Sequence, residues 1–216
     1  MSQSKRIWGW FFYDWACQPF YTLMLTFFFA PYFATVAADY FVASGMEIEA
    51  SKAKAQTMWS ICLSASGLFI GISAPILGAI ADTSGRRMPW IYVFSIMLIV
   101  GALGTWVGVP DGSNLTLMLY FFALGYIGTE FALIFTNAQL TTLGDQNEIG
   151  KIFGSGFGFG YLGGVFALAI ALLFLVEQPN GTTFMLGIEP LFGFLNPENM
   201  EGTRFVGPLA AIWFIV

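Results

Sequence analysis

Long apolar runs separated by short polar segments dominate this chain. The runs lie at about 7–38, 56–81, 89–109, 115–140 and 151–176. Each is long enough to cross a bilayer, because about 20 residues at about 1.5 Å per residue span a hydrocarbon core of roughly 30 Å. A sixth run begins near Arg204 and ends with the chain at Val216, after only about 20 Å of helix. We therefore expect an all-α membrane protein with six helices, the sixth (204–216) truncated, and an incomplete protein.

Basic residues in the short connections orient these helices. Lys5 and Arg6 precede the first run, and a double arginine ends the link 78–87 between the second and third runs. Because Lys and Arg in short loops stay on the cytoplasmic side, we expect the N-terminus inside. The segment 177–203 is then an extracytoplasmic loop. Its middle, 184–195, is apolar enough to lie at the membrane interface, although we favour an ordinary loop with scattered apolar residues.

Composition excludes most other classes of protein. Of 216 residues, 57% are hydrophobic and 10% are charged, whereas soluble domains have about 25% charged residues. The net charge of −5 offers no basic patch for nucleic acid. The chain has no His, and Cys17 and Cys62 each stand alone, so His chemistry, a disulfide framework and a C-x-x-C metal site are all absent. We expect no enzyme activity, no cofactor and no metal.

The link 78–87 carries a family resemblance. Gly78, Asp82, Gly85, Arg86 and Arg87 resemble the loop between helices 2 and 3 of the major facilitator superfamily. A generic turn, with a left-handed glycine and arginines obeying the charge rule, accounts for the same residues. The resemblance implies a twelve-helix fold in two six-helix halves with the substrate site between them. This chain would be the N-terminal half, and its loop aspartate would brace a gate against the missing C-terminal half.

Two further stretches narrow the resemblance. Residues 13–16 (Tyr-Asp-Trp-Ala) and 29–33 (Phe-Ala-Pro-Tyr-Phe) are similar to the opening of the vacuole-effluxer-like branch, which includes fungal vacuolar amino-acid effluxers. Residues 137–138 and 149–164 look like its helix 4–5 region. Cys17 departs from the branch, which typically has Asn there. The resemblance suggests amino acids as the solute, in a bacterial inner membrane or, in a eukaryote, a vacuolar membrane.

Ionisable groups inside the spans are the functional candidates, since no nucleophile–base pair or metal cluster can be assembled. Glu130 lies well inside the fourth helix, where an ionised carboxylate costs about 2.5–3.5 kcal/mol or more. We hypothesise that it faces a central cavity and binds a proton or a cationic group of the substrate. A structural hydrogen bond to a neighbouring helix is the alternative. Asp14 either functions similarly, caps the first helix at the interface, or pairs with a basic residue at a helix end. Asn137 either contacts substrate or is solvated.

Small residues and prolines predict where helices pack closely and where they bend. Gly156, Gly160 and Gly164 recur every four residues in the fifth helix and line one face, a pattern of tight helix packing. The same stretch spells G-x-G-x-x-G, but no strand precedes it, so we reject a dinucleotide site. Pro31 and Pro75 interrupt their runs and predict kinks or hinges.

These observations predict a secondary active transporter that moves a small solute by alternating access. Proton coupling is plausible because carboxylates are the intramembrane acid–base groups. The expected partners are the lipid bilayer, the solute, protons and the missing C-terminal half. The main rival is an oligomeric channel or membrane scaffold built from six helices, and composition nearly excludes a soluble nucleotide enzyme. A second apolar half in the continued reading frame would favour the carrier, and a stop codon would favour the rival.

Overall fold

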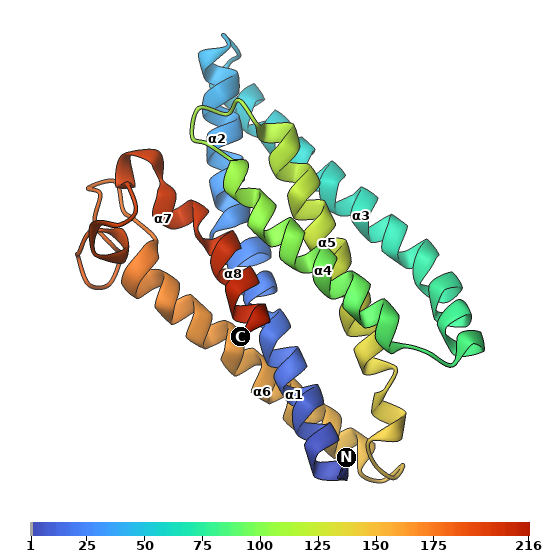
Figure 1. The fold of residues 1–216 in the computed structure, drawn as a ribbon. Helices are drawn as coiled ribbons and strands as arrows, with labels where there is room; N and C mark the ends of the chain where they lie inside the picture. The colour runs from blue at the N-terminus through green and yellow to red at the C-terminus, as the bar shows by residue number, and fades with distance from the viewer. Residues whose placement is uncertain (1) are drawn as a thin grey trace.

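Lipid offers the backbone no hydrogen-bond partner, so an apolar chain pairs its own N–H and C=O groups by forming helices. The computed structural model describes residues 2–216 of the protein (Figure 1). Its α-helices are α1 (Gln3–Pro19), α2 (Phe29–Ala43), α3 (Ile48–Ser84), α4 (Met88–Gly104), α5 (Leu115–Asn137), α6 (Ile149–Ile170), α7 (Glu201–Arg204) and α8 (Val206–Ile215). Within this range, β structure is limited to an isolated bridge between Glu177 and Thr183.

Five helical stretches in the described residues are long and apolar enough to cross a membrane. They are Gln3–Ala43, Ile48–Thr83, Met88–Val107, Leu115–Thr142 and Ile149–Leu175. They correspond in order to the five complete runs of the sequence. The sixth run corresponds to α8, and the short helix α7 precedes it, with a turn at Phe205 between the two.

The first two spans are longer than their apolar runs. Instead of ending near residue 38 and starting near residue 56, the helices continue until only residues 44–47 form the turn. The Glu47 side chain caps α3 by accepting a hydrogen bond from the Ala50 N–H at 3.0 Å. Glu49 and Lys52, three residues apart in the first turns, form an ion pair at 2.9 Å. These polar contacts extend helix α3 past the apolar core, where hydropathy alone predicts a loop.

The segment Phe20–Phe27, which joins α1 to α2, is π-helical. It lies between Pro19 and Pro31, neither of which has an N–H to give to the carbonyl four residues earlier. The Phe28 N–H instead reaches back five residues to the Leu23 carbonyl at 3.0 Å. The kink expected at Pro31 therefore appears as π-helical turns just before that residue. The proline has no N–H, so a carbonyl in those turns lacks its usual helical hydrogen bond.

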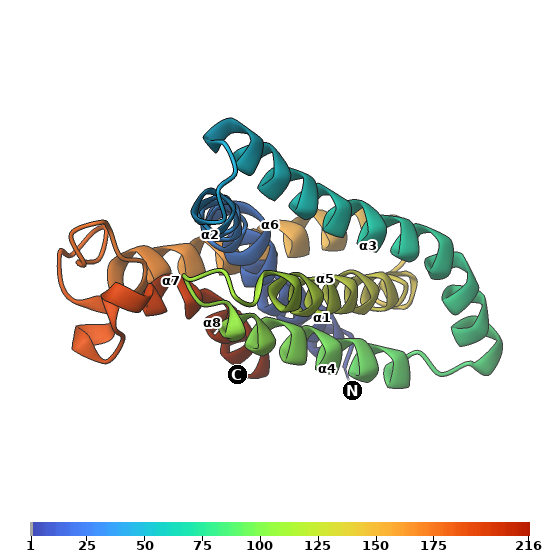
Figure 2. The same cartoon turned by 90° about the horizontal axis from the view of Figure 1, so that it is seen from above.

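The long helices pack mainly in two groups. One group sets α1 against α6, and the other sets α4 against α5 and α8 (Figures 1 and 2). Aromatic rings fill the contacts: Phe122 on α5 lies 4.5 Å from the Trp59 ring and 5.7 Å from the Phe29 ring. Nearer the opposite end of α5, the rings of Phe94 and Phe131 stack at 4.6 Å. These contacts fix α5 at the centre of the bundle.

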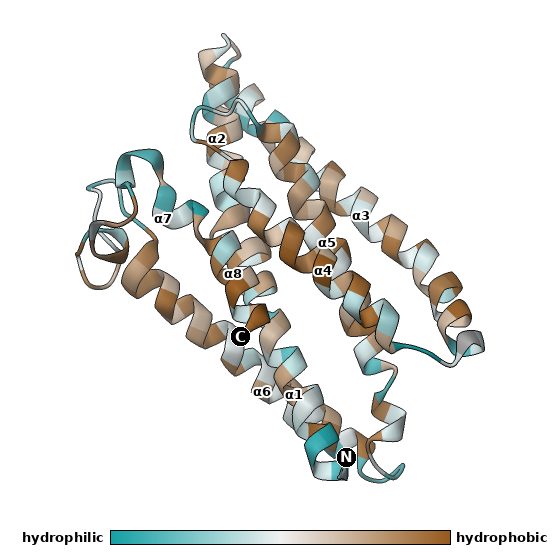
Figure 3. Cartoon of the chain, in the orientation of Figure 1, coloured by the Kyte–Doolittle hydropathy of each residue, from teal (hydrophilic) through white to brown (hydrophobic). Residues whose placement is uncertain are grey.

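Helix α3 is the least covered of the long helices. It runs along one edge of the bundle, opposite α6 (Figure 1). Only 6% of its most apolar stretch is buried. Many apolar residues of α3 therefore lie on the surface of the bundle (Figure 3). Exposed side chains such as Leu68, Ile72 and Ile76 suit a lipid or protein neighbour rather than water.

Candidate functional site

The Glu130 carboxylate, in the fourth run, accepts a hydrogen bond from another span. Tyr21, in the π-helical segment, donates its hydroxyl proton to Glu130 Oε1 on α5 at 3.0 Å. Tyr126 stands one turn before Glu130, on the same face of α5. Both tyrosines and the glutamate are half-buried. The wide turns of η1 (Phe20–Phe27) therefore carry the donor that meets this carboxylate.

The second carboxylate in the spans, Asp14, faces a glycine. Asp14 is 7% exposed, and among the described residues its Oδ2 has no hydrogen-bond partner. A Cβ atom at Gly160 of α6 would collide with this oxygen. One turn further along α6, a Cβ at Gly164 would collide with the hydroxyl of Thr22, which lies eight residues after Asp14 in the first span. The glycine stripe thus makes room for a row of polar side chains on the first span.

The remaining stripe glycine seats an aromatic residue in the same way. A Cβ at Gly156 would collide with the Trp10 ring and lie 2.8 Å from the Phe11 ring. By contrast, Gly154 and Gly158, on another face of α6, have nothing within 4 Å of an added Cβ. Replacing Gly156 should therefore disturb the close approach of α1 and α6, whereas replacing Gly154 or Gly158 should not.

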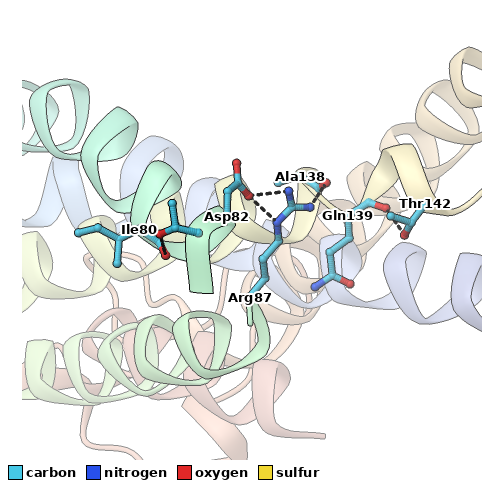
Figure 4. A network of polar contacts seen from close by, with 7 residues as sticks. Ile80, Asp82, Arg87, Ala138, Gln139 and Thr142 are labelled. Carbon is cyan, nitrogen blue, oxygen red and sulfur yellow. Dashed lines mark hydrogen bonds and ion pairs between the residues drawn. The ribbon is translucent and has the colours of Figure 1, made fainter. Parts of the chain in front are cut away.

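The link between α3 and α4 forms a polar lock with the end of α5 (Figure 4). Arg87 donates to Asp82 Oδ1 through Nε at 3.1 Å and through Nη2 at 2.7 Å. Its Nη1 donates to the Ala138 carbonyl at 2.6 Å, just beyond the last residue of α5. Gly85 ends α3 in the left-handed region with φ +64°, which glycine adopts without steric cost. Asp82 thus pairs within its own link.

Gly78 and Arg86 are the other residues of the family motif in this link. Gly78 lies in α3 with open space around an added Cβ. Arg86 is exposed. Arg87 joins the link to the end of α5 through the Ala138 carbonyl.

The Asp82→Asn variant should change the free energy of unfolding by less than about 1 kcal/mol, because the ion pair is partly exposed and screened. The side chains of Arg87 and Asp82 are 31% and 61% exposed. Arg87 keeps its bond to the Ala138 carbonyl in the variant. Chemical unfolding followed by tryptophan fluorescence measures this change. A loss of several kcal/mol would mean that the pair holds the fold together.

The candidate residues predicted from the sequence, Glu130, Asp14 and Asn137, do not form one cluster. Asn137 is exposed at the end of α5, two turns or about 10.5 Å along the axis from Glu130 and on the same face. Among the described residues, no hydrogen bond joins Asp14 to Glu130, which lie on different spans. Tyr21 was not singled out for chemistry by sequence reasoning, since a tyrosine in an aromatic-rich helix gives no distinctive signal.

A polar cluster at the other end of the bundle was also missed. Arg204 is 8% exposed; its Nη2 donates to the Trp106 carbonyl at 2.7 Å, and its guanidinium lies 4.5 Å from the Trp106 ring. Glu177, after the end of the fifth span, accepts a hydrogen bond from the Thr203 N–H at 3.0 Å. The available signal was that Glu177 and Arg204 bracket the long loop. Together these contacts tie both ends of that loop to the bundle.

Stability should rise on acidification in the range where Glu177 titrates. Burial raises the pKa of this carboxyl above its ordinary value of 4.5, against the hydrogen bonds from Thr203 and the charge of Arg204. A raised folded-state pKa means that the stabilising contribution is complete below the unfolded pKa and is lost as the pH rises through the folded pKa. Melting temperatures of the wild type and Glu177→Gln at several pH values measure this. The pH-dependent gain should be smaller in the variant, and equal profiles would contradict the assignment.

A cavity of about 1180 Å³ opens between α1, α4, α5 and α8. On its wall the hydroxyls of Tyr13 and Ser95 lie 2.8 Å apart. Lys5 and Arg6 also line it, as does Val216, the last residue of the chain. Neither member of the Tyr21–Glu130 pair is part of this wall. Among the described residues, no group of three His, Cys, Asp or Glu side chains is placed to hold a metal ion.

Comparison with known proteins gives one informative relative. The chain is similar to the uncharacterized MFS-type transporter YxiO of Bacillus subtilis (strain 168), at 26% identity over 176 residues. The match covers 81% of this chain and 39% of that protein, so it spans less than half of the relative's length. No family model matches the chain. No solved structure matches it either.

The similarity and the helices support the same class of protein. Five long apolar helices together with this relative support an integral multi-pass membrane protein. The all-helical architecture is consistent with half of a major-facilitator fold.

Proposed function

We propose that this chain is the N-terminal six-helix half of a secondary active transporter of the major facilitator superfamily. The transporter moves a small solute by alternating access, in which two halves rock about a site near the middle of the membrane. The observation that carries the proposal is the Tyr21–Glu130 hydrogen bond at 3.0 Å between the first and fourth spans. The similarity to an MFS-type transporter supports the class.

The chemistry of the Tyr21–Glu130 pair suits proton or cation binding. An ionised carboxylate in a membrane is costly, and a hydroxyl donor lowers that cost without removing the charge. When Glu130 is protonated, the same contact can persist with its oxygen as acceptor, so the pair tolerates both states. A proton, or an amine group of the substrate, therefore has a defined place to bind. Asp14 and Asn137 are secondary candidates for contacts with the solute.

The polar lock at the link 78–87 suits a gate. Asp82 and Arg87 bind one another, and Arg87 also binds the end of α5, at the mouth that we assign to the cytoplasmic side. A change of partner for either charge would alter how α3 and α4 end at that mouth. Assignment to the vacuole-effluxer-like branch, with amino acids as the solute, rests on the motifs at 13–16 and 29–33.

Transport by the full-length protein in sealed vesicles tests the proposal. Vesicles loaded at one pH and diluted into another should accumulate labelled amino acids, with an initial rate that saturates as the concentration rises. A protonophore, which collapses the pH gradient, should stop accumulation. Flux that rises linearly with concentration and ignores the gradient would instead favour an oligomeric channel. The absence of flux for every amino acid, with flux for another solute class, would remove only the assignment of the solute.

A further inference from the structure

The loop after α6 carries large apolar side chains on its surface, and we propose that it lies in the interfacial region of a neutral, zwitterionic lipid leaflet. Phe184, Met185, Phe192 and Phe194 are 63%, 61%, 70% and 84% exposed. We call these four residues the outer apolar patch. Figure 3 shows the loop beside the end of α6, with the polar turn of α7 leading away from it. The inference needs only the membrane spans and no transport activity.

Backbone hydrogen bonds set the depth of the patch. The Met185 N–H donates to the Leu172 carbonyl at 3.2 Å, and the Phe184 N–H donates to the Val176 carbonyl at 3.2 Å. The fifth span extends to Leu175. The loop therefore folds back along the last turn of its own span, and the patch continues the apolar surface of that helix. At this depth a helix end meets the boundary between headgroups and acyl chains.

The backbone is strained where it presents the patch. Leu191 and Phe192 adopt left-handed conformations with φ of 46° and 59°, which L-residues other than glycine rarely do. Such strain persists only when the surroundings reward the conformation. The Phe192 ring lies 5.8 Å from the Phe174 ring near the end of the fifth span, yet most of its surface stays open. Contact with the lipid boundary removes this open apolar surface from water.

The charges of the loop select neutral lipid. Glu177, Glu189, Glu198 and Glu201 are its acidic residues, and Arg204, directly after it, is the nearest basic residue in the sequence. Arg204 is buried against Trp106, so it does not reach the surface. Surfaces that recognise anionic headgroups use clusters of Lys and Arg. An acidic surface with exposed aromatic rings instead fits zwitterionic headgroups over acyl chains.

Spin labels in the full-length protein, reconstituted in phosphatidylcholine vesicles, test the inference. Single cysteines for labelling are introduced as Phe194→Cys in the patch, Glu198→Cys as the matched exposed loop position, and Ile96→Cys as the reference in a span. A Cys62→Ser background removes the reachable native thiol, since Cys17 is fully buried. The readout is the ratio of accessibility to oxygen, which partitions into lipid, over accessibility to a water-soluble nickel complex.

We expect the label at position 194 to give a ratio close to that at 96 and several-fold above that at 198. A ratio at 194 equal to that at 198 would place the patch in water and overturn the inference. Low accessibility to both reagents at 194 would mean that protein covers the patch, which also overturns it. A higher ratio after adding phosphatidylglycerol would refute the choice of neutral lipid. An aqueous reading at 96 would instead contradict the membrane spans themselves.

Discussion

Replacing Glu130 with Gln in the full-length protein is expected to abolish accumulation driven by a pH gradient. Glutamine keeps the size of the side chain and can still accept the hydrogen bond from Tyr21, which is 3.0 Å from Glu130 Oε1. It cannot release or bind a proton in the working pH range, so the coupling step is lost while the fold is retained. Initial rates of gradient-driven uptake in vesicles measure the effect.

Two further variants separate coupling from general damage. Tyr21→Phe removes the donor but leaves the carboxylate, so uptake should be reduced but should still respond to the gradient. Glu148→Gln changes an exposed carboxylate just before α6, outside the five spans, and should transport at the wild-type rate. If Glu130→Gln accumulates solute with the wild-type gradient dependence, Glu130 is not the proton site.

Replacing Gly160 with Leu is expected to cause the largest loss of stability among these variants. A single Cβ at this position already collides with Asp14 Oδ2, and a larger side chain would drive α1 away from α6. Overpacking a tight contact costs roughly 1–3 kcal/mol or more. Displacing Asp14 adds to this cost, since this residue is 7% exposed and its carboxylate lies against Gly160. Thermal unfolding of the detergent-solubilised protein measures the loss as a lower melting temperature.

Gly158→Leu is the matched control for this experiment. Gly158 lies two residues away on the same helix, but a Cβ there has nothing within 4 Å. Both variants remove one glycine from α6 and add the same side chain, so any difference reports the α1–α6 contact. The melting temperature of Gly158→Leu should stay near that of the wild type. Equal losses in the two variants would mean that helix propensity, not packing, sets the effect.

The membrane fold was accessible from sequence because the lipid environment imposes one simple rule. An apolar run of sufficient length has to become a helix, and the prediction of an all-α membrane protein is confirmed. The ends of the helices were less accessible. Glu47 and Glu49 stabilise the start of α3 by local polar contacts that hydropathy does not register.

Pairings between helices could not be read from the chain. The spacing of Gly160 and its neighbours indicates that α6 packs closely against another helix, but spacing does not say which helix or what fills the gap. That Asp14 faces Gly160 depends on the rotation and register of two helices almost 150 residues apart. The Tyr21–Glu130 contact depends in addition on the π-helical turns, since extra residues per turn rotate the tyrosine relative to a regular helix.

The π-helical segment Phe20–Phe27 has more residues per turn than the α-helices on either side of it. Two prolines bracket it, and both lack the amide proton that would hold neighbouring turns in strict α register. If a wide turn lost one residue and became α-helical, the side chains before that turn would rotate by about 100° relative to those after it. Tyr21 would then leave its acceptor without any shift of whole helices. Binding at the Glu130 carboxylate would in this way be coupled to a rotation of the part of the first span that precedes the change.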